Sequence, residues 1–342
     1  MAEQIDAVVV GAGPAGSAAA TLLASGGLTT ILLAGTRKPH RHWTETVPAS
    51  LGAMLPKLGL AADSLASVGT LCRWHGTEQA SFHVDRAAFD AMLRQAAIDA
   101  GARLVELKAA SMIHLGGKVA GVQTASGQAI RCRMVIDATG SRAQLSRRLA
   151  SEWRDLSPPL VAWRGEVRGV PMGMADDEAR FVSRADGRML LATWRGRTTW
   201  TFVGQAPEEP DLPSEIAALP VTIRPMAWNC GWRIARPVAG PGWVLAGEAA
   251  GRLDPTWGQG LLSAMTSGVA AGRAVCACLA DPDNEAIYLA SYDGSFVDSI
   301  IEAAESLRSR HADMSDQFRP SEVTSGMLDD QALAATGTNT LV

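Results

Sequence analysis

The stretch VVVGAGPAG, residues 8–16, decides the fold of this 342-residue chain. Its glycines Gly11, Gly13 and Gly16 have the G-x-G-x-x-G spacing and lie between an apolar strand and a helix. The first glycine permits a tight turn, the second lets the backbone approach a pyrophosphate, and the third allows the helix to pack closely on the strand. The amide groups and the positive dipole end of the helix then face the phosphates. The stretch predicts a dinucleotide site made by Gly11, Gly13, Pro14, Ala15 and Gly16.

The residues around this loop predict a β-α-β unit. An apolar strand at 5–10 precedes the loop, a helix at 14–27 begins at a proline and ends at glycines, and a second strand follows at 29–33. The second strand of such a unit normally ends in an acid that binds the adenosine ribose. Here Ala34 and Gly35 stand in its place. We expect a backbone group at Gly35 or the side chain of Arg37 to substitute for it.

Composition excludes several classes of protein. The hydrophobic fraction of 47% suits a globular chain, and the net charge of -4 gives no sign of a nucleic-acid surface. The N-terminal MAEQID lacks the features of a targeting segment, so we expect a cytoplasmic protein. The apolar stretch 261–280 contains Arg273 and many small residues, which predicts a packed helix and no membrane span. The five cysteines have no Cys-x-x-Cys spacing, which favours reduced thiols and no metal site.

A second cluster of glycines, GEAAGRLDPTWGQG at 247–260, raises the question of a second ligand contact. Glu248 follows an apolar strand, where an acid can bind a polyol hydroxyl. Gly258 and Gly260 would let the backbone approach a flat ring, and the helix that follows would stabilise negative charge there. A reduced flavin carries that charge on its N1–C2=O edge. The two clusters together predict one FAD held at both ends, the second end made by Gly247, Glu248, Pro255, Gly258, Gln259, Gly260 and Leu261.

Three motifs carry a resemblance to a known family. GAGPAG, DATG (137–140) and GEAAGRLDPTWGQGLLSAMTSGVAAG (247–272) together resemble the FAD-binding fold of the para-hydroxybenzoate hydroxylase superfamily. WTETVPASLGAMLPKLGL (43–60) and VDRAAFDAMLRQAA (84–97) are similar to segments of its halogenase-like branch. That branch includes flavin monooxygenases that modify tryptophan in partner proteins during quinone-cofactor maturation. The resemblance implies further FAD contacts at Glu45, Arg86, Thr139 and Gly140.

The chain departs from the pattern of this family at several positions. Glu248 replaces the usual aspartate, and Thr44 replaces the glycine before Glu45. Many NAD(P)H-dependent hydroxylases have Asp-Gly where this chain has Thr139-Gly140, which argues against a built-in NAD(P)H-driven cycle. The Trp-x-Trp-x-Ile-Pro signature of tryptophan halogenases does not occur in the sequence, which argues against halogenation.

The pattern and the resemblance together imply an α/β fold. We expect a Rossmann-like FAD-binding domain, with a β-α-β unit, a parallel sheet and a small meander, and an inserted antiparallel substrate domain. The FAD-binding domain is predicted to consist of three segments, at 1–70, 84–154 and 237–283. The other predicted regions are a substrate-domain strand or connection at 71–83, the antiparallel substrate domain at 155–236, a C-terminal helix at 284–314 and a mobile tail at 315–342.

Three residues are candidates for chemistry. The resemblance places His42 and Glu45 near the flavin ring, where either could transfer a proton, and Trp257 within the flavin loop. A solvated basic loop around His42, and core packing for most of the ten tryptophans, are the alternatives.

The resulting hypothesis is an FAD-dependent monooxygenase that acts through a C4a-(hydro)peroxyflavin. Its substrate would be an electron-rich aromatic, including tryptophan, as a small molecule or within a partner protein or peptide. One dinucleotide loop implies that NAD(P)H binds transiently or that an external flavin reductase supplies electrons. Two alternatives stay open, namely a geranylgeranyl-reductase-like flavin reductase or dehydrogenase and a non-catalytic flavin- or partner-binding module.

Overall fold

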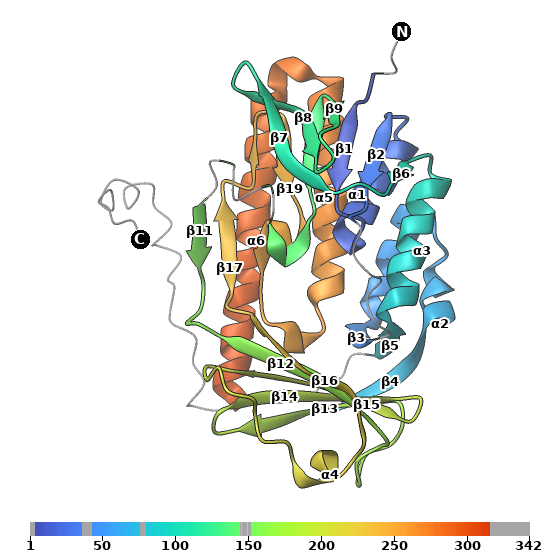
Figure 1. The fold of residues 1–342 in the computed structure, drawn as a ribbon, viewed down its shortest axis with the longest axis vertical. Helices are drawn as coiled ribbons and strands as arrows, with labels where there is room; N and C mark the ends of the chain where they lie inside the picture. The colour runs from blue at the N-terminus through green and yellow to red at the C-terminus, as the bar shows by residue number, and fades with distance from the viewer. Residues whose placement is uncertain are drawn as a thin grey trace, which may run out of the picture.

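A parallel sheet forms the centre of one half of the molecule (Figure 1). The computed structural model describes residues 4–35, 43–75, 80–143, 145, 149 and 152–314. The sheet has six strands in the order β18-β19-β10-β1-β2-β6, all parallel except for β18, which pairs antiparallel with β19. The strands are β1 (Ala7–Val10), β2 (Thr30–Leu33), β6 (Arg103–Val105), β10 (Met134–Asp137), β18 (Ala239–Gly240) and β19 (Trp243–Leu245).

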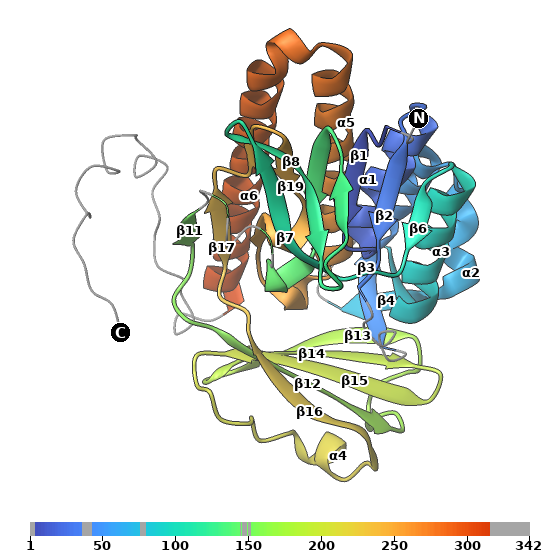
Figure 2. The ribbon, with the colours of Figure 1, turned by 45° about the horizontal axis from the view of Figure 1, so that its top comes forward.

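Helices flank this sheet, and the two longest, α5 and α6, follow one another near the C-terminal end of the described residues (Figures 1 and 2). The main helices are α1 (Pro14–Ser25), α3 (Arg86–Asp99), α5 (Gly260–Ala280) and α6 (Glu285–Met314). The short ones are η1 (Ala49–Leu58), η2 (Ala62–Ser64), α2 (Leu65–Val68), η3 (Gly140–Arg142), α4 (Ser214–Ala217), η5 (Gly247–Ala249), η6 (Pro255–Trp257) and η7 (Pro282–Asn284). Helix α1 packs against both α3 and α5.

The contact between α1 and α5 is close because small residues meet there. A Cβ atom added at Gly268 would overlap the backbone of Ala15, and one at Gly272 would lie 2.9 Å from Leu22 Cδ2. Helix α5 has the length and apolar composition of a membrane span, but half of its most apolar window is buried inside the fold. Its small residues serve helix packing in this structure, as its composition predicts.

An antiparallel sheet of eight strands forms the other half, in the order β16-β12-β15-β14-β13-β4-β5-β3. Its strands are β3 (Thr44–Pro48), β4 (Gly69–His75), β5 (Ser81–Asp85), β12 (Val161–Arg168), β13 (Glu178–Arg184), β14 (Gly187–Trp194), β15 (Arg197–Gly204) and β16 (Val221–Asn229). All its neighbouring strands are antiparallel except β4 and β13. The sheet therefore draws three strands from outside residues 155–236, and β3 belongs to it although the sequence placed residues 1–70 in the FAD-binding domain.

Two three-stranded sheets complete the fold. The first is the predicted meander, which lies beside the parallel sheet and consists of β7 (Ala109–Leu115), β8 (Lys118–Thr124) and β9 (Ala129–Arg131). The second joins β11 (Glu152–Asp155), β17 (Arg233–Arg236) and β20 (Gly251–Arg252). These layers confirm the predicted α/β fold with an inserted antiparallel layer. Residues 315–342 lie outside the described residues.

Candidate active site

The loop between β1 and α1 has the geometry that a pyrophosphate requires. Gly11 has a φ of +109°, and a Cβ atom there would overlap the carbonyl oxygen of Ala138. A Cβ atom on Gly16 would overlap the carbonyl oxygen of Gly11, whereas one on Gly13 would meet nothing within 4 Å. Gly11 and Gly16 are therefore in tight contact with neighbouring backbone, whereas the space beside Gly13 is free for a phosphate. These residues fit the FAD that the sequence predicts.

Helix α1 begins at this loop without a side-chain cap. Gly13 is its N-cap residue, Pro14 occupies the first turn, and no acidic side chain lies in that turn. The first amide groups of the helix therefore lack a side-chain cap and lie at the positive end of the helix dipole. They would hold the pyrophosphate of FAD.

The two glycine clusters of the sequence meet in space. Gly247 has a φ of +62°, and a Cβ atom there would lie 2.9 Å from the Cβ atom of Ala15. The amide of Gly247 donates a hydrogen bond to Ser267 Oγ at 2.9 Å, which joins the strand end to helix α5. Gly247 thus contacts the GAGPAG loop, and the two clusters lie side by side.

The DATG segment (137–140) lies beside the GAGPAG loop. Asp137 ends β10 fully buried and accepts a hydrogen bond from the amide of Thr139 at 2.9 Å. Gly140 has a φ of +69°, and a Cβ atom there would meet nothing within 4 Å. The two predicted residues, Thr139 and Gly140, therefore lie at the carboxyl edge of the parallel sheet, as Gly11 does.

Residues 253–259, between β20 and α5, form a loop, here called the late loop, that leads into the uncapped start of helix α5. Gly258 has a φ of +65°, and a Cβ atom there would lie 2.5 Å from the carbonyl oxygen of Thr46, so the loop packs on β3. Gln259 gives α5 no side-chain cap, and Gly260 is exposed with open space above it. The backbone amides there are available to the N1–C2=O edge of a flavin. Pro255 starts η6, and the side chain of Leu261 is buried in the core, so only its backbone remains a candidate contact.

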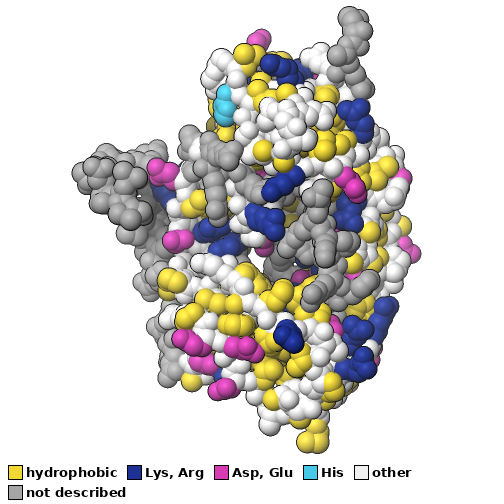
Figure 3. Space-filling view, in the orientation of Figure 1, with side chains coloured by type: hydrophobic (Ala, Val, Ile, Leu, Met, Phe, Trp, Pro, Cys, Tyr) yellow, Lys and Arg dark blue, Asp and Glu magenta, His cyan; other side chains and the backbone are white. Residues whose placement is uncertain are grey.

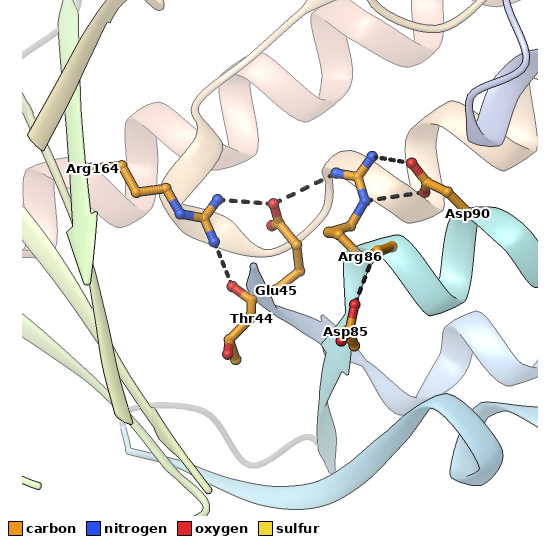
Figure 4. Close-up of polar contacts among 7 residues, drawn as sticks. Thr44, Glu45, Asp85, Arg86, Asp90 and Arg164 are labelled. Atoms are coloured by element: carbon orange, nitrogen blue, oxygen red, sulfur yellow. Dashed lines mark hydrogen bonds and ion pairs between the residues drawn. The ribbon is translucent and has the colours of Figure 1, made fainter. Parts of the chain in front are cut away.

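Glu45 lies between two arginines that come from different elements (Figure 4). Arg164 on β12 donates a hydrogen bond from Nη1 to Glu45 Oε1 at 2.9 Å, and another from Nη2 to the carbonyl oxygen of Thr44. Arg86 at the start of α3 has its Nη1 atom 3.5 Å from the same Glu45 oxygen. The predicted residues Glu45 and Arg86 are thus brought together, and Arg164 is a site residue that the sequence did not reveal.

Asp90 holds Arg86 from the other side. It accepts hydrogen bonds from Arg86 Nε and Nη2, each at 3.1 Å, one helical turn further along α3. Burial by itself lowers the pKa of Arg86, but the carboxylates around it outweigh burial and raise that pKa. These carboxylates are those of Asp90, Glu45 and Glu248. The spacing of Arg86 and Asp90 is a signal from which the pair could have been predicted.

Trp257 lies in an aromatic row that joins the late loop to the antiparallel sheet. Its side chain is 8% exposed, and its ring centroid lies 4.9 Å from that of Phe181. Phe181 in turn lies 5.6 Å from Trp74. The register places Phe181 opposite Leu190, Leu190 opposite Thr201 and Thr201 opposite Arg164, so Arg164 and Phe181 face the same side of the sheet. That face of the sheet is the candidate surface for contact with a substrate.

A buried ion pair anchors the late loop to the sheet. Arg188 on β14 bonds Asp254, and their side chains are 4% and 0% exposed. Asp254 also accepts a hydrogen bond from the amide of Thr256 at 2.8 Å, which caps η6. The guanidinium of Arg188 lies 5.4 Å from the Trp257 ring centroid. No spacing in the sequence links residues so far apart, so this pair was not predicted.

Of the remaining predicted residues, some are exposed in the structure and others lie outside the described residues. Gly35 is exposed beyond the end of β2 with open space above it, whereas Arg37 and His42 lie outside the described residues. Glu248 is exposed beside Gly247. Figure 3 shows a hollow between the two halves of the molecule, with Lys and Arg side chains above it. Such side chains suit an anionic cofactor.

Replacing Glu248 by alanine is expected to weaken FAD binding by about 1–3 kcal/mol, because a hydroxyl of the cofactor loses its partner. The measurement is a titration of flavin-stripped protein with FAD, followed by flavin fluorescence. Glu248→Asp is the matched control, since aspartate is the residue of the resembled family, and it should bind FAD nearly as wild type does. Unchanged affinity in Glu248→Ala would show that this acid does not contact the cofactor.

His83 is a buried titratable group beside the site. No motif in the sequence marks this residue. It is 0% exposed, and its Nδ1 atom lies 3.0 Å from Thr46 Oγ1. Burial lowers the pKa of His83 from 6.5 to about 4, although the backbone of Glu178 and the charge of Asp176 partly oppose the change. The folded protein therefore keeps this imidazole neutral at neutral pH.

This pKa predicts a loss of stability in acid. Because the unfolded chain binds the proton more readily, the contribution of His83 is present above pH 6.5 and declines as the pH falls towards 4. We expect the free energy of unfolding to fall by about 2 kcal/mol from this group between pH 7 and pH 5. Urea unfolding of wild type and His83→Gln at both pH values measures it. An equal pH dependence in the two proteins would exclude the effect.

Comparisons with known proteins find similar chains. A family model described as tryptophan halogenase matches residues 60–176. The menaquinone reductase of Mycolicibacterium smegmatis is 26% identical over 310 residues, which cover 76% of this chain and 74% of that protein. The myxobacterial chondrochloren halogenase CndH has a TM-score of 0.77 at 20% identity, covering 93% of this chain and 84% of that one.

A second solved structure is similar over most of the chain. The peptidyl tryptophan dihydroxylase QhpG has a TM-score of 0.74 at 21% identity, covering 92% of this chain and 76% of the QhpG chain. At these identities the structural matches establish the fold. Together with the family model and the reductase, they confirm the resemblance seen in the three motifs. The chain has the fold of the halogenase-like FAD-dependent flavoproteins and is similar to flavin-dependent oxidoreductases.

Proposed function

We propose that this protein is an FAD-dependent monooxygenase that hydroxylates an electron-rich aromatic ring. The observation that carries the proposal is the aromatic row Trp257–Phe181–Trp74, which joins the late loop to the sheet. Aromatic side chains favour a planar aromatic partner through offset or edge-to-face contacts. A ring bound along this row would lie next to the start of α5, where the flavin ring is expected.

Each group of residues has a role in this proposal. When bound, FAD would supply two electrons and the activation of oxygen, so that one oxygen atom enters the ring and the other leaves as water. The loop Gly11–Gly16 would bind the pyrophosphate, and the amides at Gly260 would stabilise negative charge on the flavin. The buried aromatic row keeps water away from the reacting ring. Glu45, held by Arg86 and Arg164, is the described candidate for moving a proton.

A flavin reductase is the second candidate function, because a specific match favours it. Menaquinone reductases of two mycobacterial genera align over 76% of this chain. A reductase would transfer two electrons and two protons to an alkene and would consume no oxygen. The aromatic row would then pack against the ring or the chain of a prenylated substrate.

Labelled oxygen separates the two candidates. FAD-loaded protein is supplied with NADH, NADPH or an external flavin reductase under ¹⁸O₂, together with indole, a tryptophan-containing peptide or a prenylated quinone. Mass spectrometry of a monooxygenase product shows one ¹⁸O atom. A product heavier by two hydrogens and free of ¹⁸O would instead establish the reductase. A Gly13→Val protein carried through the same procedure is the control for reaction without bound flavin.

The same experiment also identifies the electron donor. The chain has one G-x-G-x-x-G loop, which FAD would occupy. NAD(P)H must then bind transiently, or a partner reductase must deliver the electrons. Omission of each donor in turn identifies the one that supports product formation.

A further inference from the structure

We infer that Glu106 supplies the carboxylate that binds the adenosine ribose of FAD, in place of the acid that is missing after β2. This inference rests on the proposed use of FAD. Strand β2 ends at Leu33 and is followed by Ala34 and Gly35, neither of which offers a side-chain acceptor. An acid that binds these hydroxyls would therefore come from another element at the same edge of the sheet.

Strand β6 is that element. It pairs with β2 in parallel, with Leu33 opposite Val105, and the two strands lie side by side at one edge of the sheet (Figures 1 and 2). The pairing extends past the end of β2, since the amide of Ala34 donates to the carbonyl oxygen of Val105 at 2.9 Å. The backbone after Val105 is therefore held next to Ala34.

Glu106 is the first residue after β6. Because β1, β2 and β6 are parallel, Glu106 lies at the carboxyl edge that also carries Gly11 and Gly13. Ligands of open α/β sheets bind along this edge. The side chain of Glu106 is exposed, and no ion pair or hydrogen bond engages it within the described residues. Its carboxylate is thus available at the edge where the adenosine end of FAD must lie.

Two features support the replacement of the missing acid after β2 by Glu106 after β6. The open space around Gly35 leaves room for the ribose beyond the end of β2. Adjacent strands lie about 4.8 Å apart, a distance that an extended glutamate side chain can span. A carboxylate there can accept hydrogen bonds from both the 2′- and the 3′-hydroxyl.

The test pairs removal of the acid with removal of the hydroxyls. Flavin-stripped wild type, Glu106→Ala and Glu302→Gln are titrated with FAD and with the FAD analogue built on 2′,3′-dideoxyadenosine. Glu302 is an exposed carboxylate on α6 and serves as the matched control. We expect Glu106→Ala to raise the Kd for FAD about tenfold or more while leaving the Kd for the analogue unchanged, since hydrogen bonds to charged groups are among the stronger ones.

Two results would overturn the inference. An unchanged Kd for FAD in Glu106→Ala would show that Glu106 does not contact the cofactor. An equal loss for FAD and the analogue would show a contact other than the ribose hydroxyls. Failure of wild type to bind FAD at all would count against the proposed function as well, which the isotope experiment judges separately. Urea unfolding of each variant confirms that affinities are compared between folded proteins.

Discussion

Replacing Gly13 by valine is expected to give a folded protein that retains no FAD. A Cβ atom at Gly13 meets nothing within 4 Å, so the fold accepts the new side chain. The same side chain fills the space through which the pyrophosphate must approach the backbone. Purified Gly13→Val protein should lack the visible flavin spectrum that wild type is expected to have, while its urea unfolding midpoint stays close to that of wild type.

Gly16→Ala provides the contrasting control. A Cβ atom there overlaps the carbonyl oxygen of Gly11, so alanine should disrupt the packing of α1 on β1 and unfold the protein or lower its midpoint strongly. The two glycines stand three residues apart, yet one variant should lose the cofactor and the other the fold. Full flavin retention by Gly13→Val would refute the placement of the pyrophosphate.

Replacing Arg188 by methionine is expected to lower the free energy of unfolding by about 3–5 kcal/mol. The side chain of Asp254 is 0% exposed, and loss of its buried partner leaves a carboxylate in a site with little water. Because Asp254 also caps η6, the late loop that leads to α5 should loosen as well. Urea unfolding measures the first effect, and the affinity for FAD measures the second.

The double variant Arg188→Met/Asp254→Asn tests the cause. Asparagine has no charge but keeps the oxygen that accepts the hydrogen bond from the Thr256 amide. The double variant should therefore recover most of the lost stability, because removal of both charges of a buried pair is often nearly neutral. A double variant as unstable as Arg188→Met would show that packing of the arginine, and not charge, provides the stabilisation.

The dinucleotide loop and its surroundings were predictable because their determinants are local. Gly11, Gly13 and Gly16 sit between an apolar strand and a helix, at the spacing that a dinucleotide-binding turn requires. The meander was predictable for the same reason, since short turns at 116–117 and 126–127 separate its strands. Glu45 and Arg86 came from the resemblance, and the structure places them together.

The residues that escaped prediction are set by pairing between distant strands. Strand β3 lies within the first seventy residues but joins the antiparallel sheet through β5, and no turn signal announces that pairing. Arg164 reaches Glu45 only because β12 and β3 belong to one eight-stranded sheet, and Arg188 reaches Asp254 only because that sheet brings β14 against the late loop. The register of a sheet depends on packing over its whole face, which a single sequence does not display.

The order of strands in the parallel sheet has a consequence for how the protein is made. Strand β10 lies between β1 and β19, and α1 packs against α5, so the earliest and latest segments of the FAD-binding half complete each other. The antiparallel sheet needs no residue beyond Asn229, whereas the parallel sheet needs β19 and then α5 up to Ala280. Because domains form as their residues leave the ribosome, the inserted layer can assemble while the parallel sheet still lacks a strand. The dinucleotide loop is thus made well before β19 and α5, the elements that complete its site.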